Sequence, residues 1–176
     1  MRKTALALVS FGFLAPALAL AQPSAGTPYV GGQYSHLDAD VSGVSGSWNP
    51  DALVARGGYF FNEYFAVEGR AGTGLSDDTD NGVDVELDYM IGGYARGNLP
   101  VSNVVSLYGM AGVTHAEATA SGGGVSVTDD DTGPSYGVGA EFNVANDLGL
   151  SVEWMRYMDE SDYDVDAISV GMNYHF

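Results

Sequence analysis

The residues best suited to catalysis are the three histidines of the 176-residue chain and their neighbours. His36 follows Ser35, His115 stands two residues before Glu117, and His175 is the last residue but one. A nucleophile needs a base within hydrogen-bond reach, and a zinc site needs at least three protein ligands. These histidines belong to three separate predicted strands, and the His115–Glu117 pair lacks a third ligand. The sequence therefore predicts no enzyme, no cofactor and no metal centre.

Clustered carboxylates could instead bind a hard cation such as calcium. The segment 77–88 partly matches a calcium loop, but Thr79 replaces an acidic ligand and no helices are expected around it. Its weak cation candidates are Asp77, Asp80, Asp84 and Asp88. Further acidic clusters occur at 129–131 and 159–166. We expect these clusters mainly to form a solvated negative surface, with loose divalent bridging to lipid phosphates as an intermediate possibility.

Six charged residues interrupt segments that are otherwise rich in apolar residues. They are Arg56, Glu68, Arg70, Arg96, Glu141 and Glu153. Charges at membrane depth are costly unless each has a partner of opposite sign. We therefore expect these residues to share one interior, either as an ion-paired core that closes it or as a gate whose pairs exchange.

Eight strands can be predicted by alternation of apolar with small or polar residues and by the turn residues between them. They are 28–37, 52–61, 64–74, 83–97, 104–117, 135–143, 148–158 and 164–176. Each has about the 9 to 11 residues that a tilted membrane strand requires, or somewhat more. Residues predicted to face outward are Phe65, Val67, Val85, Leu87, Tyr89, Ile91, Tyr136, Val138, Ala140, Phe142, Leu148, Leu150, Val152 and Trp154. The fifth strand does not alternate cleanly, so its facing stays open.

Short and long connections alternate along the chain. The short ones are 62–63, 98–103 and 144–147, and the long polar ones are 38–51, 75–82, 118–134 and 159–163. This rhythm predicts an all-β fold, an eight-stranded antiparallel up-and-down transmembrane β-barrel with short periplasmic turns and long acidic extracellular loops. A Greek-key sandwich would not separate its loops in this way. A barrel of eight strands has just enough bore for side chains to fill it.

The N-terminal segment has the features of a secretory signal. Arg2 and Lys3 precede an apolar run that ends in Ala19-Leu20-Ala21, which predicts a cleaved signal peptide over 1–21 and one barrel domain over 22–176. Cleavage would leave four arginines, no lysine and 23 acidic residues, a net charge of −19. Nucleic acid is therefore excluded as a partner, because phosphate binding needs positive charge. The absence of cysteine excludes a disulfide scaffold.

Several segments resemble the small outer-membrane β-barrel family that includes OmpA-type transmembrane domains, OmpX-like proteins and opacity-type adhesins. They are Tyr29-Val-Gly-Gly, the segments 57–68 and 137–142, and the Tyr-His-Phe end. By this resemblance Tyr174 and Phe176 correspond to the family's C-terminal assembly signal. The resemblance also implies inward-facing carboxylates at Glu68, Glu141 and Glu153.

The resemblance implies a location in the outer membrane of a Gram-negative cell. The expected partners are outer-membrane lipid, lipopolysaccharide and the barrel assembly machinery, and the expected state is a monomer. We expect a structural or surface-interaction role, with the acidic loops free to contact a surface ligand. The alternative is a narrow porin or a transport channel for small solutes.

Overall fold

The computed structural model describes residues 25–41, 47–48, 51–75, 78–80, 83–122, 125–159 and 163–176. Within these ranges the regular elements are all strands, and no helix is long and apolar enough to cross a membrane. The predicted signal peptide lies outside the described residues, so its cleavage stays a prediction.

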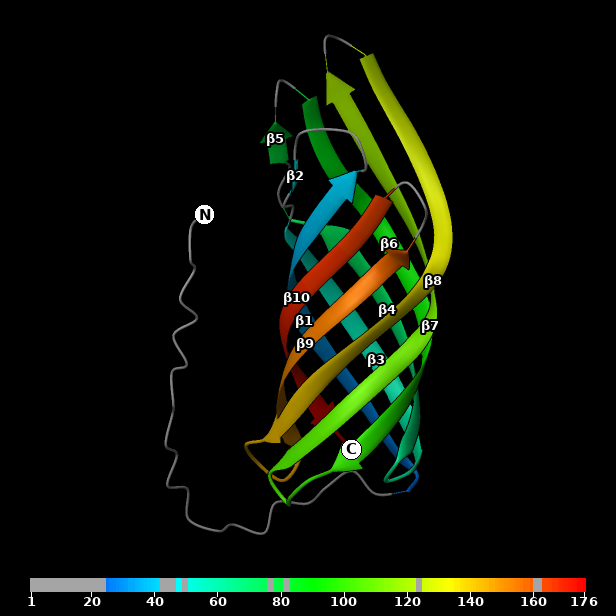
Figure 1. The fold of residues 1–176 in the computed structure, drawn as a ribbon. Helices are drawn as coiled ribbons and strands as arrows, with labels where there is room; N and C mark the ends of the chain where they lie inside the picture. The colour runs from blue at the N-terminus through cyan, green and yellow to red at the C-terminus, as the bar shows by residue number, and fades with distance from the viewer. Residues whose placement is uncertain are drawn as a thin grey trace, which may run out of the picture.

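Eight long strands follow one another around a cylinder (Figure 1). They are β1 (Thr27–Val41), β3 (Asp51–Asn62), β4 (Phe65–Gly74), β6 (Val83–Pro100), β7 (Val105–Gly122), β8 (Val125–Asn143), β9 (Leu148–Asp159) and β10 (Tyr163–His175). Two short strands, β2 (Ser47–Trp48) and β5 (Asp78–Asp80), pair with β1 and β6.

Antiparallel pairing between the first and last long strands closes the barrel. Each long strand pairs with its neighbour in the chain, and β10 then pairs with β1 from Tyr29–His175 to Val41–Tyr163. Closure leaves no sheet edge around the wall, so every backbone polar group can be satisfied within lipid. The predicted eight-stranded antiparallel barrel is confirmed.

The short connections lie at one end of the barrel. Three of them join β3 to β4, β6 to β7 and β8 to β9, and the chain ends at the same level (Figure 1). In the first turn the side-chain oxygen of Asn62 accepts the N–H groups of Tyr64 and Phe65, both at 2.9 Å. Such a local bond fixes a tight turn. By the resemblance noted from the sequence, this end corresponds to the periplasmic end of an outer-membrane barrel.

Alternation places the predicted apolar face outside for most strands. Phe65, Val138 and Val152 are all well exposed on the wall. Leu87 is an exception, because a β-bulge between Leu87 and Tyr89 shifts the register and turns Leu87 toward the interior cluster. Its predicted outward facing is therefore wrong.

The fifth predicted strand, whose facing the sequence left open, now has assigned faces. Tyr108 and Met110 are buried inside, while Leu107 and Val113 are exposed on the wall. Both faces of this strand are apolar, which explains why alternation could not separate them.

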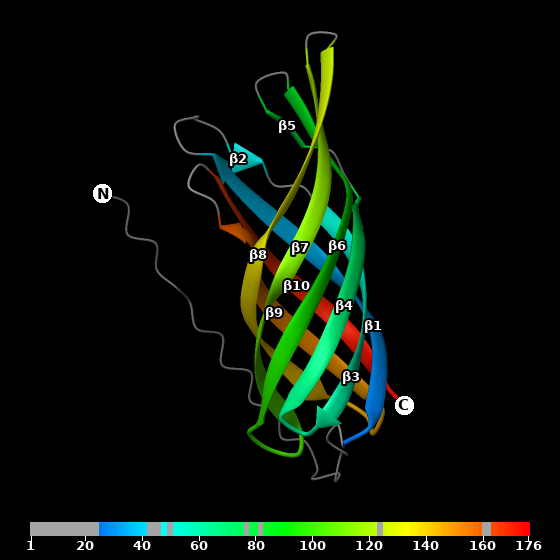
Figure 2. The same ribbon diagram turned by 90° about the vertical axis from the view of Figure 1, so that its right-hand side faces the viewer.

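The third predicted loop, 118–134, is largely strand. β7 and β8 pair without a break from Val105–Phe142 to Gly122–Val125 and rise beyond the other strands (Figures 1 and 2). Hydroxyl groups meet across this extension, with Thr119 and Thr128 as well as Ser121 and Ser126 2.9 Å apart. Cross-strand pairs of this kind stabilise a sheet and carry it above the membrane.

Candidate functional site

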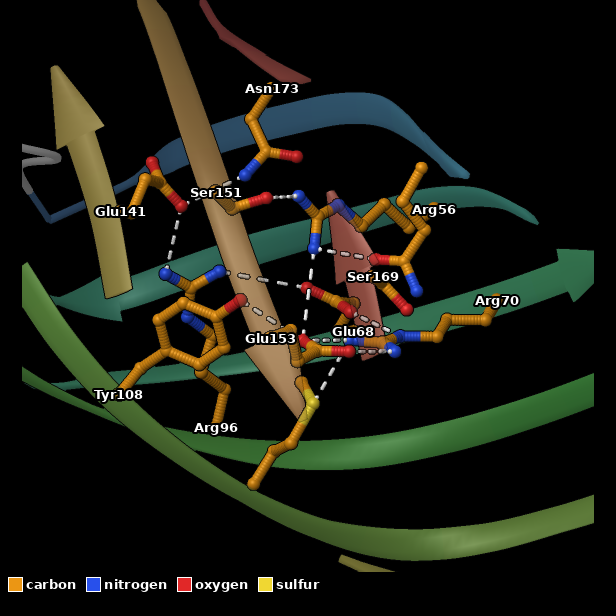
Figure 3. A network of polar contacts seen from close by, with 12 residues as sticks. Arg56, Glu68, Arg70, Arg96, Tyr108, Glu141, Ser151, Glu153, Ser169 and Asn173 are labelled. Atoms are coloured by element: carbon orange, nitrogen blue, oxygen red, sulfur yellow. Dashed lines mark hydrogen bonds and ion pairs between the residues drawn. The ribbon is translucent and has the colours of Figure 1, made fainter. Parts of the chain in front are cut away.

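All six charged residues predicted for the interior meet there, at the level shown in Figure 3. Arg56, Glu68, Arg70, Arg96, Glu141 and Glu153 are each at most 4% exposed. They come from β3, β4, β6, β8 and β9, so strands far apart in sequence contribute to one cluster. We call these six residues the interior network.

Arg70 is the most fully bonded member of the network. Its Nη1 and Nη2 donate to the two carboxylate oxygens of Glu153 at 2.6 and 2.7 Å, and its Nε donates to Glu68 at 2.7 Å. Weaker contacts reach the Tyr157 hydroxyl at 3.3 Å and the Met110 sulfur at 3.0 Å. Every guanidinium nitrogen thus has a partner, and the bidentate pair is the strongest arrangement available to arginine.

Arg56 binds mainly neutral partners. Its Nη1 donates to the Gln33 side-chain oxygen at 3.0 Å and its Nη2 to the Ser151 hydroxyl at 2.5 Å. The carboxylate of Glu153 lies 3.8 Å from Nη1. Glu153 therefore stands between two arginines and also accepts the Tyr108 hydroxyl at 3.0 Å.

Arg96 makes few hydrogen bonds for a buried arginine. Its Nη2 donates to Glu141 at 3.0 Å, with a longer contact to Asn98 at 3.4 Å, and Nη1 lies 3.7 Å from Glu68. Its Nε and Nη1 make no hydrogen bond within the described part of the chain. Hydrogen bonding alone therefore does not account for the stabilisation of this buried positive charge.

Aromatic rings surround the Arg96 guanidinium. Its central carbon lies 3.9 Å from the centre of the Tyr108 ring, 5.5 Å from Phe60 and 5.7 Å from Tyr29. A guanidinium within about 6 Å of a ring face is attracted by the ring quadrupole. We call Tyr29, Phe60 and Tyr108 the aromatic cage.

Glu141 links the network to the periplasmic end. It accepts Arg96 at 3.0 Å and the Asn173 side-chain amide at 2.8 Å on one oxygen, and contacts His175 Nε2 at 2.7 Å through the other. His175 is only 7% exposed. The penultimate residue of the chain is thereby tied to the centre of the barrel.

Several members of the site were not predicted from the sequence. Tyr29 donates its hydroxyl to Glu68, and Gln33, Tyr108, Ser151 and Asn173 also bind network residues. They could have been found from alternation, because each lies an even number of residues from another inward-facing position on its strand. Asn173 and His175, for example, alternate with the exposed Met172, Tyr174 and Phe176.

Apolar and hydroxyl side chains fill the bore on the extracellular side of the network. Leu37, Val54, Met90, Met155 and Tyr157 pack there in one buried cluster. Hydroxyl groups between them bond to one another, as in Ser35 to Ser169 at 2.8 Å and Tyr94 to Thr114 at 2.6 Å. The bore thus changes from charged to apolar along its axis.

Small residues on neighbouring strands make room for the large interior side chains. A Cβ at Gly58 would collide with the Tyr29 ring, and one at Gly139 with the Tyr108 ring. In a bore just wide enough for side chains, these glycines leave the space that the two rings occupy. The interior is therefore packed with side chains at the level of the network.

The remaining histidines, His36 and His115, do not contact a serine in the described residues. Ser35 points inward to Ser169, whereas His36 points outward and contacts Asp51 at 2.9 Å. His115 contacts the Tyr89 and Thr132 hydroxyls at 3.2 and 2.8 Å. His115 thus has the hydroxyl contacts expected of a side chain near the extracellular end of the barrel wall.

The weak cation candidates are only partly described. Asp77 and the side chains of Asp80 and Asp84 lie outside the described residues, while the Asp88 carboxylate accepts the Thr119 hydroxyl at 2.7 Å. No group of three metal-ligating side chains occurs among the residues described.

A closed eight-stranded barrel with an apolar wall, a charged interior and short turns at one end defines the class of small outer-membrane β-barrel proteins. The family model for the outer membrane protein beta-barrel domain matches residues 4–176, so the chain belongs to this family. It is therefore a protein of the Gram-negative outer membrane.

Solved structures share the fold at low sequence identity. Ail, the attachment invasion locus protein of Yersinia pestis, is 22% identical with a TM-score of 0.68, covering 86% of this chain and 99% of that one. Neisserial surface protein A is 21% identical with a TM-score of 0.68, and the match covers 86% of this chain and 99% of that one. OprG of Pseudomonas aeruginosa is 14% identical with a TM-score of 0.56, and the match covers 89% of this chain and 99% of that one. No curated protein matches the chain by sequence.

Proposed function

We propose that this protein is a closed outer-membrane barrel that acts through its extracellular surface rather than through a pore. The observation that carries the proposal is the filled interior. Three arginines and three glutamates neutralise one another across the bore, and an apolar cluster lies above them. Breaking such buried pairs would leave uncompensated charge in a low dielectric, so opening a path through them is costly.

The strand extension offers a surface for a partner. β8 pairs with β9 only from Tyr136 to Asn143, so within the described residues its segment 125–135 is paired with β7 alone. Exposed strand edges are common docking sites for extended segments. The N–H of Asp130 donates to the Asp129 carboxylate at 3.1 Å, and the N–H of Thr132 to Asp131 at 2.6 Å. These bonds occupy two of the backbone donors along the edge.

The charge of the surface indicates the kind of partner. After residue 3 the chain has only four basic residues besides histidine, and three of them are the buried arginines of the network. The fourth, Arg156, binds Asp166 through two bonds of 2.8 and 2.9 Å. Of the 23 acidic residues three lie in the network, which leaves 20 for the rest of the chain. We therefore infer a cationic partner.

This inference separates the protein from one of its structural relatives. Ail has been crystallised with the heparin analogue sucrose octasulfate, a polyanion. After residue 3 the present chain has four arginines and no lysine, and three of the arginines are buried, so we expect it not to bind that compound.

We further propose that the protein is a monomer without catalytic activity or cofactor, surrounded by outer-membrane lipid and lipopolysaccharide. Tyr174 and Phe176 support recognition by the assembly machinery, because both are exposed at the periplasmic end, 46% and 70% respectively. Their rings pack edge to face with centroids 5.1 Å apart.

Binding of a cationic probe tests the proposed surface. The protein in lipid nanodiscs should bind decalysine with an affinity that falls as salt rises, and should not bind sucrose octasulfate. The variant Asp129→Asn/Asp130→Asn/Asp131→Asn should weaken decalysine binding roughly ten-fold, since exposed charge pairs each contribute little.

Asp147→Asn, which removes one carboxylate from a periplasmic turn, is the control and should weaken decalysine binding by less than about two-fold. Equal binding by the wild type and the triple variant would reject the extension as the binding surface. Binding of sucrose octasulfate would reject the cationic partner.

A further inference from the structure

The outer wall of the barrel has two unlike sides. On β3, β4, β6 and β7 most outward positions at mid-height are small residues, with Val67, Ile91 and Val113 as exceptions, whereas on β8, β9, β10 and β1 they are mostly large. The small ones are Ala55, Gly57, Gly69, Ala71, Gly93, Ala95, Gly97, Gly109 and Ala111. The large ones include Val138, Leu150, Val152, Ile168, Val170, Met172 and Val30.

Packing within the chain does not require the outward glycines. A Cβ at Gly93 would meet nothing within 4 Å, and those at Gly97 and Gly109 would only approach backbone oxygens at 3.9 and 3.8 Å. Inward glycines such as Gly58 and Gly139 instead face atoms that a Cβ would strike. Glycine weakens a strand, so outward glycines with open space above them suggest an external contact.

A groove follows the lower part of this side. Its volume is about 610 Å³, and Phe65, Gly97, Leu99, Leu107, Gly109 and Val138 line it. β6, β7 and β8, which pair in that order, form most of its lining, and β4, beside β6 in Figure 2, adds Phe65. The glycines supply the floor, and the exposed side chains of Phe65, Leu99, Leu107 and Val138 supply the sides.

The periplasmic end of the groove carries a fixed polar turn. Tyr64 lines the groove beside the exposed Glu63 that precedes it in the turn. Asn98 holds this turn in place, because its N–H donates to the Tyr64 carbonyl at 2.7 Å and its side chain to the Glu63 carbonyl at 3.1 Å. An aromatic residue with a polar tip at this level is typical of a membrane interface.

The charge at this end is negative. Glu63 is exposed, and the three periplasmic turns contain no lysine or arginine. A head group that carries an ammonium would meet a carboxylate here, while a purely anionic head group would be repelled.

We propose that the groove binds one acyl chain of an amine-bearing phospholipid in the periplasmic leaflet, with the lipid ammonium at Glu63. The groove is continuous with the lipid-facing wall, so hydrocarbon chains reach it directly. A flexible chain fits a narrow groove with a glycine floor. A second barrel would first meet Phe65 and Leu99, which are 61% and 60% exposed and stand at its sides.

Lipid retention measured by native mass spectrometry tests the proposal. The delipidated protein is titrated with phosphatidylethanolamine or phosphatidylglycerol that carry the same acyl chains. The wild type should retain one phosphatidylethanolamine and favour it over phosphatidylglycerol by about three-fold, the size expected for one exposed ion pair. Gly97→Leu/Gly109→Leu should reduce retention at least about five-fold by filling the groove.

Two further variants test acyl-chain binding and head-group recognition independently. Glu63→Gln should bind both lipids equally while still retaining one. Gly32→Leu is the matched control, because Gly32 is exposed on β1 outside the groove and a Cβ there would only approach a backbone oxygen at 3.8 Å. It should retain lipid like the wild type.

Folding of each variant is verified by its gel mobility before and after boiling. Equal retention by the wild type and Gly97→Leu/Gly109→Leu would overturn the groove as the site. Stronger retention of phosphatidylglycerol by the wild type would overturn the head-group assignment. A wild-type dimer that Gly97→Leu/Gly109→Leu abolishes would show that a second copy occupies the groove, and would also overturn the proposal.

Discussion

Arg70 and Arg96 lie in the same network but are compensated in different ways. Arg70 binds two carboxylates through three nitrogens, and its guanidinium carbon also lies 5.0 Å from the centre of the Tyr94 ring. Arg96 has one carboxylate at hydrogen-bond distance, leaves Nε and Nη1 without a hydrogen bond among the described residues, and stacks on the Tyr108 ring. A narrow barrel can therefore hold buried positive charge with carboxylates or with aromatic faces.

The two surroundings follow from position along the bore. Both are almost fully buried, but Arg70 lies farther from the periplasmic turns, beside the apolar cluster, and close ion pairs with Glu68 and Glu153 offset its desolvation. Arg96 lies nearer the periplasmic turns, where Tyr29 and Phe60 extend inward and replace hydrogen-bonding partners. The predictions below test this difference between the two arginines.

Removing the Glu153 side chain should lower the free energy of unfolding more than any of the other substitutions below. Glu153→Ala would take both carboxylate oxygens from Arg70 and the nearest carboxylate from Arg56. Orphaning a buried ion typically costs about 3 to 5 kcal/mol, and we expect the upper part of that range. Urea unfolding in lipid vesicles, followed by gel mobility, measures the loss. A loss below that of Glu141→Ala would reverse the proposed ranking.

Glu141→Ala should cost somewhat less, about 3 kcal/mol. Arg96 would keep the aromatic cage and the Glu68 carboxylate at 3.7 Å from its Nη1. The same unfolding assay gives the value. Unchanged unfolding would mean that Glu141 is not part of a buried pair.

Lysine at each arginine position should sharpen the comparison. Arg70→Lys removes the bidentate bond to Glu153 and should cost about 2 kcal/mol. Arg96→Lys keeps a charge near Glu141 but loses the planar stack on Tyr108, which contributes about 1 kcal/mol. Urea unfolding curves of the two variants give the difference in their free energies of unfolding. Equal losses of stability would argue that Arg70 and Arg96 are stabilised in the same way.

Substitutions at Tyr108 should have the smallest effect on the free energy of unfolding. They distinguish the contribution of its hydroxyl from that of its ring. Tyr108→Phe loses the hydroxyl bond to Glu153 but keeps the ring over Arg96, at a cost of about 1 kcal/mol. Tyr108→Leu loses both contacts and should cost about 1 kcal/mol more. Identical stability of the two variants would show that the ring face contributes nothing.

The sequence predicted much of this fold because alternation reports directly on a barrel wall. Phe65, Val138 and Val152 were assigned to the correct face by parity alone. Leu87 was not, because a bulge adds a residue without any sequence feature that marks it clearly. The extension over 118–134 was missed because its Asp, Gly and Ser residues are also typical of loops, whereas its pairing depends on cross-strand contacts.

The membership of the charged interior was also predictable, but its pairing was not. Parity shows that Arg70 and Glu153 share the bore, yet they are 83 residues apart in the chain. Their contact depends on barrel closure, strand stagger and the space left by glycines on neighbouring strands. Tyr108 was left unassigned for a related reason, since an aromatic residue suits the lipid face and the bore equally well.

Single-channel conductance of the refolded chain in a planar bilayer tests the central claim that the interior is closed. We predict no discrete openings of residues 22–176, because the network and the apolar cluster fill the bore. Variants with Arg56, Arg70 or Arg96 changed to Ala are measured beside it. Discrete openings of the wild type that these variants alter would contradict the claim and establish a small channel with the network as its gate.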